Sequence, residues 1–217
     1  YLCSKPLIYE PQVRILLFDN QDSFTWNLAH DLERVNDDVN VEVKTASDLK
    51  DSLNNKEKLK EFVRAFDAVV LSPGPGMPAD ASGLIEILEA AIELKKPLLG
   101  VCLGLQVIVE HYGGTLENMR NVLHGRTTKV SLEDCDQSGG WAKDIQFPCE
   151  VGHYHSWVAI DKNFPESELH IEARNEQGMI MAICHRTLPI TGLQFHPESI
   201  LTPDGRTILA GWLNSFA

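Results

Sequence analysis

The sequence predicts an α/β fold in which helices flank a mostly parallel central sheet and antiparallel strands extend it. Two features favour this fold. Up to residue 112, short apolar runs alternate with longer amphipathic segments, which is the order of β-α-β units. After two glycines at 113–114, short segments of alternating polar and apolar residues follow, which is typical of antiparallel strands. With 217 residues and 43% hydrophobic content, residues 13–217 can form one domain with an ample core, preceded by a lead-in over residues 1–12.

The parallel part of the sheet is expected from four short apolar runs, each followed by a longer segment of helical character. The predicted strands are residues 13–18, 41–44, 67–71 and 97–101, and the predicted helices are residues 24–34, 56–66, 81–94 and 103–112. Asp22 or Ser23 would cap the first helix. The apolar side of that helix carries Phe24, Leu28 and Leu32.

The second half of the chain contains five further strand candidates. They are residues 127–132, 157–160, 169–173, 179–184 and 190–195, and we expect them to extend the sheet as antiparallel hairpins. Residues 134–140 are polar and predict a turn, and a last helix is expected at residues 203–216. We find no internal repeat and no low-complexity segment.

The bulk composition narrows the classes of partner. The formal net charge of −12 and the pI near 5.0 argue against nucleic acid or an anionic membrane surface. The sequence has no apolar run of membrane-spanning length and no signal-peptide pattern. Its five cysteines are scattered and include no Cys-x-x-Cys, which fits free thiols in a reducing compartment. We therefore expect a cytoplasmic protein.

Cys102 lies where a predicted strand turns directly into a predicted helix. Residues 100–104 read Gly-Val-Cys-Leu-Gly, which matches the G-x-nucleophile-x-G elbow with cysteine in place of serine. The two glycines would let the helix approach the strand closely and let a substrate reach the sulfur. The helix N-terminus adds partial positive charge, which favours a thiolate. The alternative is a buried structural cysteine, since cysteine packs as a small hydrophobe.

A base for such a nucleophile is predicted at His196, directly after the apolar run that begins at residue 190. His196 and Glu198 are two residues apart in extended chain, so their side chains can face a common partner. A carboxylate against one imidazole nitrogen sets the tautomer and raises the basicity of the other. The alternative is a loop histidine beside a surface glutamate.

Residues 73–76, Pro-Gly-Pro-Gly, offer hydrogen-bond donors for a developing oxyanion. Prolines lack an amide hydrogen, so Gly74 and Gly76 are the donors there, and Gly74 with the amide of Leu103 would form a two-donor hole. The carboxyl ends of parallel strands share one edge, which would bring Asn20, Gly74 and Cys102 together. The alternative is a plain rigid turn; a phosphate loop is excluded because its lysine and spacing are absent.

Other candidate sites are weaker. A zinc site could be imagined from His153 and His155 with Cys149 or with Cys184 and its neighbouring histidine, but the spacing matches no zinc finger. We therefore expect no metal. Ser156 could be a second nucleophile, but it lacks an elbow.

Several motifs in order resemble a known family. Residues 72–76, 100–104 and 194–201 (Gln-Phe-His-Pro-Glu-Ser-Ile-Leu) are similar to motifs of the class I (triad) glutamine amidotransferases, which have a flavodoxin-like fold. The segments 19–25, 124–127 and 154–156 narrow the resemblance to the glutaminase subunits (component II) of anthranilate synthase and aminodeoxychorismate synthase. It runs from about residue 13 to the C-terminus, although residues 137–150 are not firmly covered. Leu105 and Gln21 depart from the family's usual histidine and tyrosine, so we expect altered packing or interface there.

The resemblance implies a role for each motif. Cys102 would attack the side-chain amide of L-glutamine, His196 would transfer protons and Glu198 would hold His196. The amides of Gly74 and Leu103 would stabilise the oxyanion. The residues implied to hold glutamine are Gly74, Pro75, Gly76, Gln106, Ser156 and Trp157. The ammonia would pass to a separate chorismate-binding synthase subunit contacting segments 20–24 and 124–127, and this chain would need no metal or organic cofactor.

Three other functions remain open. A free-standing cysteine amidase or peptidase on the same fold would turn over fully without a partner. A non-enzymatic regulatory subunit would keep the fold, but its usual mark is a lost catalytic residue. A flavodoxin-like nucleotide-binding module would leave Cys102, His196 and Glu198 unexplained.

Overall fold

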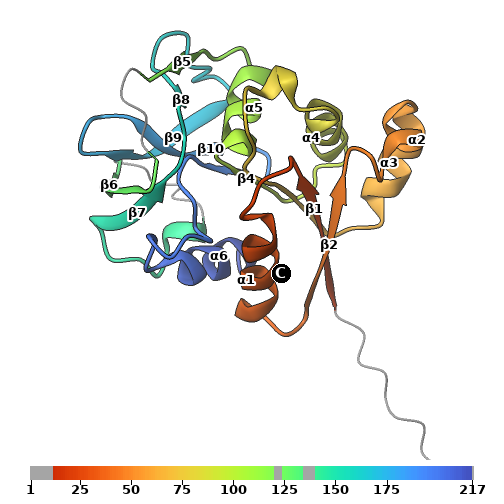
Figure 1. The fold of residues 1–217 in the computed structure, drawn as a ribbon, viewed down its shortest axis with the longest axis horizontal. Helices are drawn as coiled ribbons and strands as arrows, with labels where there is room; N and C mark the ends of the chain where they lie inside the picture. Colours follow the sequence, from red (N-terminus) through yellow and green to blue (C-terminus); the bar gives the residue numbers. More distant parts are fainter. Residues whose placement is uncertain (1–11, 120–123, 134–139, 217) are drawn as a thin grey trace, which may run out of the picture.

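A nine-stranded sheet forms the centre of the computed structural model, which describes residues 12–119, 124–133 and 140–216 (Figure 1). Its strand order is β2-β1-β3-β4-β11-β10-β9-β6-β7. The strands are β1 (Val13–Asp19), β2 (Val39–Thr45), β3 (Ala68–Leu71), β4 (Leu98–Val101), β6 (Arg126–Leu132), β7 (Cys149–His153), β9 (Leu169–Asn175), β10 (Ile180–His185) and β11 (Ile190–Leu193). Strands β2, β1, β3, β4 and β11 pair in parallel, and the pairs from β11 to β7 are antiparallel. The predicted α/β fold with an antiparallel extension is confirmed.

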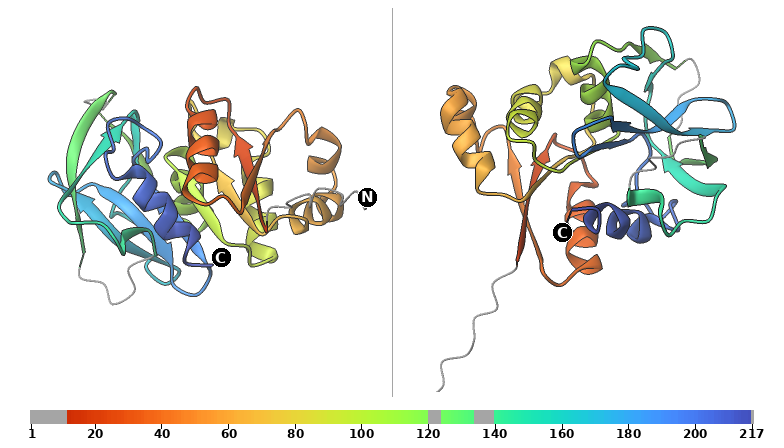
Figure 2. Two further views of the ribbon diagram at one scale, coloured as in Figure 1. Left: turned by 90° about the horizontal axis from the view of Figure 1, so that it is seen from below. Right: turned by 180° about the vertical axis from the view of Figure 1, so that it is seen from behind.

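Helices cover both faces of the parallel part of the sheet. Helices α1 (Thr25–Val35) and α6 (Gly205–Leu213) lie side by side on one face (Figure 2). Helices α3 (Lys56–Arg64), α4 (Leu84–Glu93) and α5 (Leu103–His111) cover the other, with the short α2 (Lys50–Leu53) beside them. Two short 3-10 helices, η1 (Pro78–Asp80) and η2 (Gly140–Ala142), complete the helical elements of the described residues. Alternate residues of each strand therefore face different helices, which is why the strands read as continuous apolar runs.

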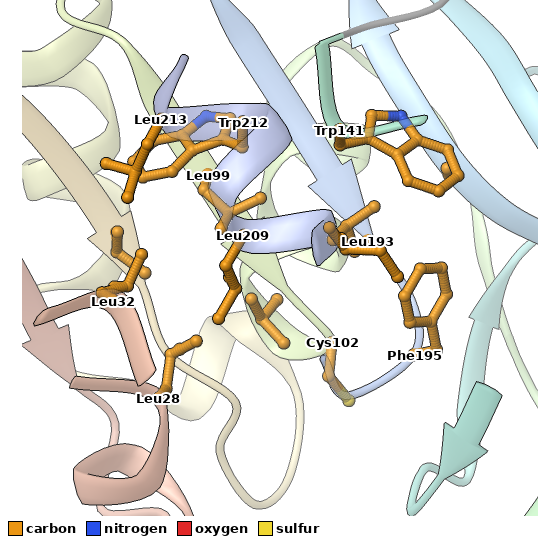
Figure 3. Close-up of a cluster of buried hydrophobic side chains, with 14 of the residues drawn as sticks. Leu28, Leu32, Leu99, Cys102, Trp141, Leu193, Phe195, Leu209, Trp212 and Leu213 are labelled. Carbon is orange, nitrogen blue, oxygen red and sulfur yellow. The ribbon is translucent and has the colours of Figure 1, made fainter. Parts of the chain in front are cut away.

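The hydrophobic core on the α1–α6 side of the sheet includes Cys102. Figure 3 shows leucines of α1 and α6 around Leu99 of β4, with Trp212 beside Leu213 and with Trp141 near Leu193 and Phe195. The Cys102 side chain lies at the end of this cluster, and its sulfur points away from the leucines. The core thus holds the cysteine backbone while leaving the sulfur at the carboxyl edge of the sheet.

The predicted partner of one strand is wrong. The sequence pattern places residues 157–160 in the main sheet, but β8 (Trp157–Ala159) pairs with β5 (Leu116–Asn118) in a separate two-stranded sheet. The alternating pattern indicates a strand but does not choose its neighbour. Strand β11 also differs from a simple hairpin, because it pairs in parallel with β4 and antiparallel with β10. Residues 1–11 of the lead-in and 134–139 of the predicted turn lie outside the described residues.

The predicted cap of the first helix is also wrong. Phe24 occupies the N-cap position of α1, and its side chain makes no capping hydrogen bond. Asp22 instead accepts a hydrogen bond from the backbone N–H of Phe24 at 2.8 Å, and Asp19 accepts one from the Thr25 hydroxyl at 2.7 Å. Carboxylates therefore fix the turn before the helix. No helix of the described ranges has the length and apolar character needed to cross a bilayer.

Candidate active site

The turn predicted at residues 100–104 is present and is tightly built. Cys102, between β4 and α5, has φ 52° and ψ −98°, a backbone conformation that residues other than glycine rarely adopt. A Cβ on Gly100 would lie 2.4 Å from the carbonyl oxygen of Gly104, and a Cβ on Gly104 would lie 2.5 Å from that of Leu71. Only glycine fits both positions, so the local sequence dictates the turn. Such strained residues cluster at functional sites.

His196 and Glu198 form a buried pair directly after β11. His196 Nδ1 lies 2.7 Å from Glu198 Oε1, and the two residues are 2% and 6% exposed. Burial lowers the pKa of the imidazole, but the charge of Glu198 and the neighbouring Cys102 sulfur raise it by more, so the pKa of His196 lies well above 6.5. Within the described residues, Nε2 has no hydrogen-bond partner of ordinary geometry, which leaves this nitrogen for Cys102. The structure therefore brings Cys102, His196 and Glu198 together.

Thr202 holds the segment that carries His196, a role that no sequence motif indicated. Its hydroxyl donates to the carbonyl oxygen of His196 at 2.6 Å and accepts from the backbone N–H of Gly152 at 3.0 Å. The His196 N–H in turn donates to the Gly152 carbonyl at 3.1 Å. A Cβ on Gly205, at the start of α6, would lie 1.8 Å from the Pro197 carbonyl oxygen. These contacts join β7, the His196 segment and α6 into one unit.

Aromatic rings cover the imidazole of His196. The Tyr154 ring lies edge-on to it at 5.0 Å between centroids, and the Phe24 ring does so at 6.2 Å. The Tyr154 hydroxyl is 3.0 Å from Ser199 Oγ. The sequence pattern places Phe24 on the core face of α1, but its ring turns toward the site instead. The rings shield the imidazole from solvent, which strengthens its interaction with the Glu198 carboxylate.

A cavity of about 100 Å³ opens beside Cys102. Its lining residues are Gly74, Pro75, Gly76, Cys102, Gln106, Tyr154, His155, Ser156 and Trp157. The six residues implied by resemblance to hold glutamine all line it. Three segments that are distant in sequence thus form one wall around the sulfur. A larger cavity of about 580 Å³ lies between α1 and residues 197–206, but Cys102 does not line it.

Gly74 packs directly against the start of α5. A Cβ on Gly74 would lie 2.7 Å from Leu103 Cδ2 and 2.6 Å from Asn20 Cβ. Asn20 fixes this loop, because its backbone N–H donates to Ser72 Oγ at 2.8 Å and its side chain donates to the Ser72 carbonyl at 3.0 Å. Leu103 is the first residue of α5, so its N–H is one of those that a helix leaves without an intrahelical partner. Asn20, Gly74 and Cys102 therefore share one edge, as the sequence predicts.

The histidines considered for zinc form a buried pair of their own. His153 Nε2 lies 2.7 Å from the Thr128 hydroxyl, and His153 Nδ1 lies 3.2 Å from His155 Nε2. Burial lowers the pKa of His153 to about 4 and that of His155 to about 3, so both are neutral at pH 7. Burial also raises the pKa of the Cys149 thiol to about 11. Within the described residues, no three His, Cys, Asp or Glu side chains are grouped to hold a metal ion.

The two departures from the family pattern do not line the cavity beside Cys102. Leu105, in α5, is fully buried in the core on the side of the sheet that α3, α4 and α5 cover. Gln21 is exposed with φ 62°, and its N–H donates to Asp19 Oδ1 at 2.9 Å. Leu105 therefore acts on packing, and Gln21 belongs to a surface turn.

The chain is similar to known proteins over most of its length. Residues 16–215 match the family model of class-I glutamine amidotransferases, so the chain belongs to that family and is a glutamine amidotransferase. Anthranilate synthase component 2 of Mycobacterium tuberculosis is 39% identical over 204 residues, covering 93% of this chain and 82% of that protein. The protein of the same name from Azospirillum brasilense is 37% identical, covering 93% and 95%.

The fold has a counterpart among solved structures. A Thermoplasma acidophilum protein assigned to GMP synthase superposes with a TM-score of 0.76 at 22% identity, covering 93% of this chain and 92% of that one. At this identity the likeness concerns the fold alone. The flavodoxin-like class I amidotransferase architecture expected from the motifs is thereby confirmed.

Proposed function

We propose that this chain hydrolyses L-glutamine to glutamate and ammonia through Cys102, His196 and Glu198, and supplies the ammonia to a partner synthase. The observation that carries the proposal is the pairing of His196 Nδ1 with Glu198 at 2.7 Å, which leaves Nε2 for the Cys102 sulfur. The cavity beside that sulfur supports a small substrate. A nucleophile, a base and an orienting carboxylate are the parts that acyl transfer needs.

The first half of the reaction breaks the amide bond. The Cys102 thiolate attacks the side-chain amide carbon of glutamine, forming the S–C bond and moving an electron pair onto the carbonyl oxygen. The N–H groups of Gly74 and Leu103 stabilise this oxyanion. As the C–N bond breaks, the His196 imidazolium gives its proton to the leaving nitrogen, and ammonia departs. The raised pKa of His196 supports this step, because it favours the protonated ring that donates the proton.

The second half hydrolyses the thioester. Water attacks the thioester carbon and passes a proton to His196, and collapse of the second oxyanion releases glutamate and the thiolate. Glu198 holds the imidazole throughout. These steps use only side chains, backbone amides and water, so we propose that this chain needs no metal or organic cofactor.

Glutamine is held by the cavity wall in this proposal. Gly74 to Gly76 present backbone close to the ligand, since glycine leaves room for it. Gln106, Ser156 and Trp157 form the other side. The Gln106 side chain donates to the Trp157 carbonyl at 2.9 Å, which joins α5 to β8 and fixes that wall.

The partner we propose is a separate chorismate-binding synthase subunit, with anthranilate synthase favoured over aminodeoxychorismate synthase. The name of the relatives, anthranilate synthase component 2, supports this choice. The proposed contact segments are residues 20–24 and 124–127. One aromatic ring from each segment contacts Tyr154: the Phe24 ring lies 5.1 Å and the His124 ring 5.3 Å from the Tyr154 ring, between centroids. A partner on these segments would therefore bear on the ring that covers His196. The net charge of −12 supports a protein partner over nucleic acid or an anionic membrane.

The test is to purify the chain with and without its cellular synthase partner, and to measure glutamate formed from glutamine. We expect low activity alone, a rise on adding the synthase, and an aromatic amine from chorismate and glutamine. Cys102→Ser should abolish glutamate formation, whereas Cys184→Ser, outside the cavity, should not. Full activity alone on several amides would favour a free-standing amidase, and an active Cys102→Ser would refute the nucleophile.

A further inference from the structure

Gln194 contacts the Cys102 sulfur, although it does not line the cavity. It follows β11 directly and is fully buried. Its side-chain Nε2 lies 3.6 Å from Cys102 Sγ, a hydrogen-bond distance for a sulfur acceptor. Its backbone N–H donates to the Met181 carbonyl at 2.8 Å, so the sheet holds its main chain whatever its side chain does. The side chain is therefore available for another role.

The direction of this hydrogen bond is set by a chain of amides. The Trp157 carbonyl can only accept, so Gln106 turns its NH₂ group toward it, at 2.9 Å. The same Nε2 lies 3.5 Å from Gln194 Oε1, which accepts its second hydrogen. Gln194 must then present its own NH₂ group to the sulfur. Gln106 and Gln194 are 2% and 0% exposed, so water does not compete for these bonds.

On the basis of the glutaminase function proposed above, we propose that Gln194 is a positioning residue whose side-chain amide stabilises the Cys102 thiolate and fixes the direction of its sulfur. The strained backbone at Cys102 fixes the Cα–Cβ direction, but the side chain can still rotate about that bond. An N–H donor favours the charged form of an acceptor, so it acts on the thiolate rather than the thiol. Because Trp157 lies in the cavity wall, the same chain of hydrogen bonds ties that wall to the sulfur.

The test is the rate at which iodoacetamide alkylates Cys102 in the full chain without glutamine, read on the peptide by mass spectrometry. In Gln194→Leu the rate at about pH 7 should fall roughly tenfold, since a hydrogen bond to a charged group is lost. At about pH 10 the two rates should converge, because high pH favours a thiolate with or without the donor. Leu193→Val removes packing at the neighbouring position but no hydrogen bond, so its alkylation rate should match that of the wild-type protein at both pH values. Equal rates for Gln194→Leu and wild type at about pH 7 would overturn the proposal.

A second variant is needed if circular dichroism shows that Gln194→Leu does not fold. Gln194→Glu keeps the shape but replaces the donor by a carboxylate, so alkylation at about pH 7 should be slower than in wild type. Wild-type alkylation in this variant would equally overturn the positioning role.

Steady-state kinetics with the synthase separate positioning from structure. Gln194→Leu should lower kcat about tenfold with little change in KM, because Gln194 does not touch the cavity. A KM effect with unchanged kcat would contradict the role. If wild-type protein makes no glutamate at all, the proposed function fails, whereas the alkylation difference still decides whether Gln194 acts on the sulfur.

Discussion

Cys102 owes its unusual backbone to its neighbours. Gly100 and Gly104 were predicted from spacing alone, and the structure gives the reason, since either Cβ would strike backbone within 2.5 Å. His196 and Glu198 were likewise predicted from their spacing. Gln194 was part of a quoted motif, but its hydrogen bond to the sulfur depends on contacts across 92 residues of chain. Local patterns therefore identified the residues of the proposed triad, but not the contacts that surround them.

The buried histidine pair makes stability depend on pH. The folded pKa values of about 4 and about 3 lie below the unfolded value of 6.5, so the unfolded chain binds more protons between these limits. Stability should therefore fall as the pH drops below about 6.5, by roughly 2 kcal/mol for each histidine at pH 5. His196, with a raised pKa, has the opposite sign: its contribution is complete below about 6.5 and is lost as the pH rises through the raised value.

Urea unfolding at pH 7 and pH 5 measures this dependence. His155→Gln should lose part of the acid sensitivity, because a neutral amide cannot be protonated there. His30→Gln, at an exposed position of α1, should keep it. The same loss of stability in His155→Gln and wild type would show that this pair does not govern the acid response.

Pairing between elements was the part that sequence patterns could not supply. Periodicity located most strands of the main sheet and most of the helices that cover it, because buried strands and amphipathic helices have characteristic local patterns. It missed β5 and β7, and it placed residues 157–160 in the main sheet, because neighbours are chosen by contacts distant in sequence. The prediction of a cap for α1 was wrong for a similar reason, since Asp19 and Asp22 stabilise the preceding turn instead.

Thr202 joins β7 to the His196 segment through one hydroxyl, so its removal should affect the site. Thr202→Val keeps the shape but removes the bond to the Gly152 N–H and leaves the His196 carbonyl with only the Ser199 N–H as a donor. We expect a loss of about 2–4 kcal/mol in unfolding free energy and a lower kcat. Thr191→Val, a buried threonine on β11, is the matched control, and chemical denaturation with a glutaminase assay measures both. If the two variants behave alike, Thr202 does not hold the His196 segment.

The topology of the whole molecule assembles the site. Strands β1, β3, β4 and β11 are neighbours in the sheet and run in parallel, so the segments that follow them meet at one edge. Those segments carry Asn20, Gly74, Cys102 and His196. The rule that ligands bind at the carboxyl ends of parallel strands made this convergence predictable. The cover from Tyr154 was not predictable, because it comes from the antiparallel extension.

The most direct test is to look for the thioester. The chain with its synthase partner is mixed with L-glutamine, quenched in acid during turnover, digested and examined by mass spectrometry. A glutamyl group should appear on the peptide that contains Cys102, and it should be absent from the other cysteines and from Cys102→Ala. Steady glutamate production with no adduct on Cys102, or an active Cys102→Ala protein, would contradict covalent catalysis at this residue.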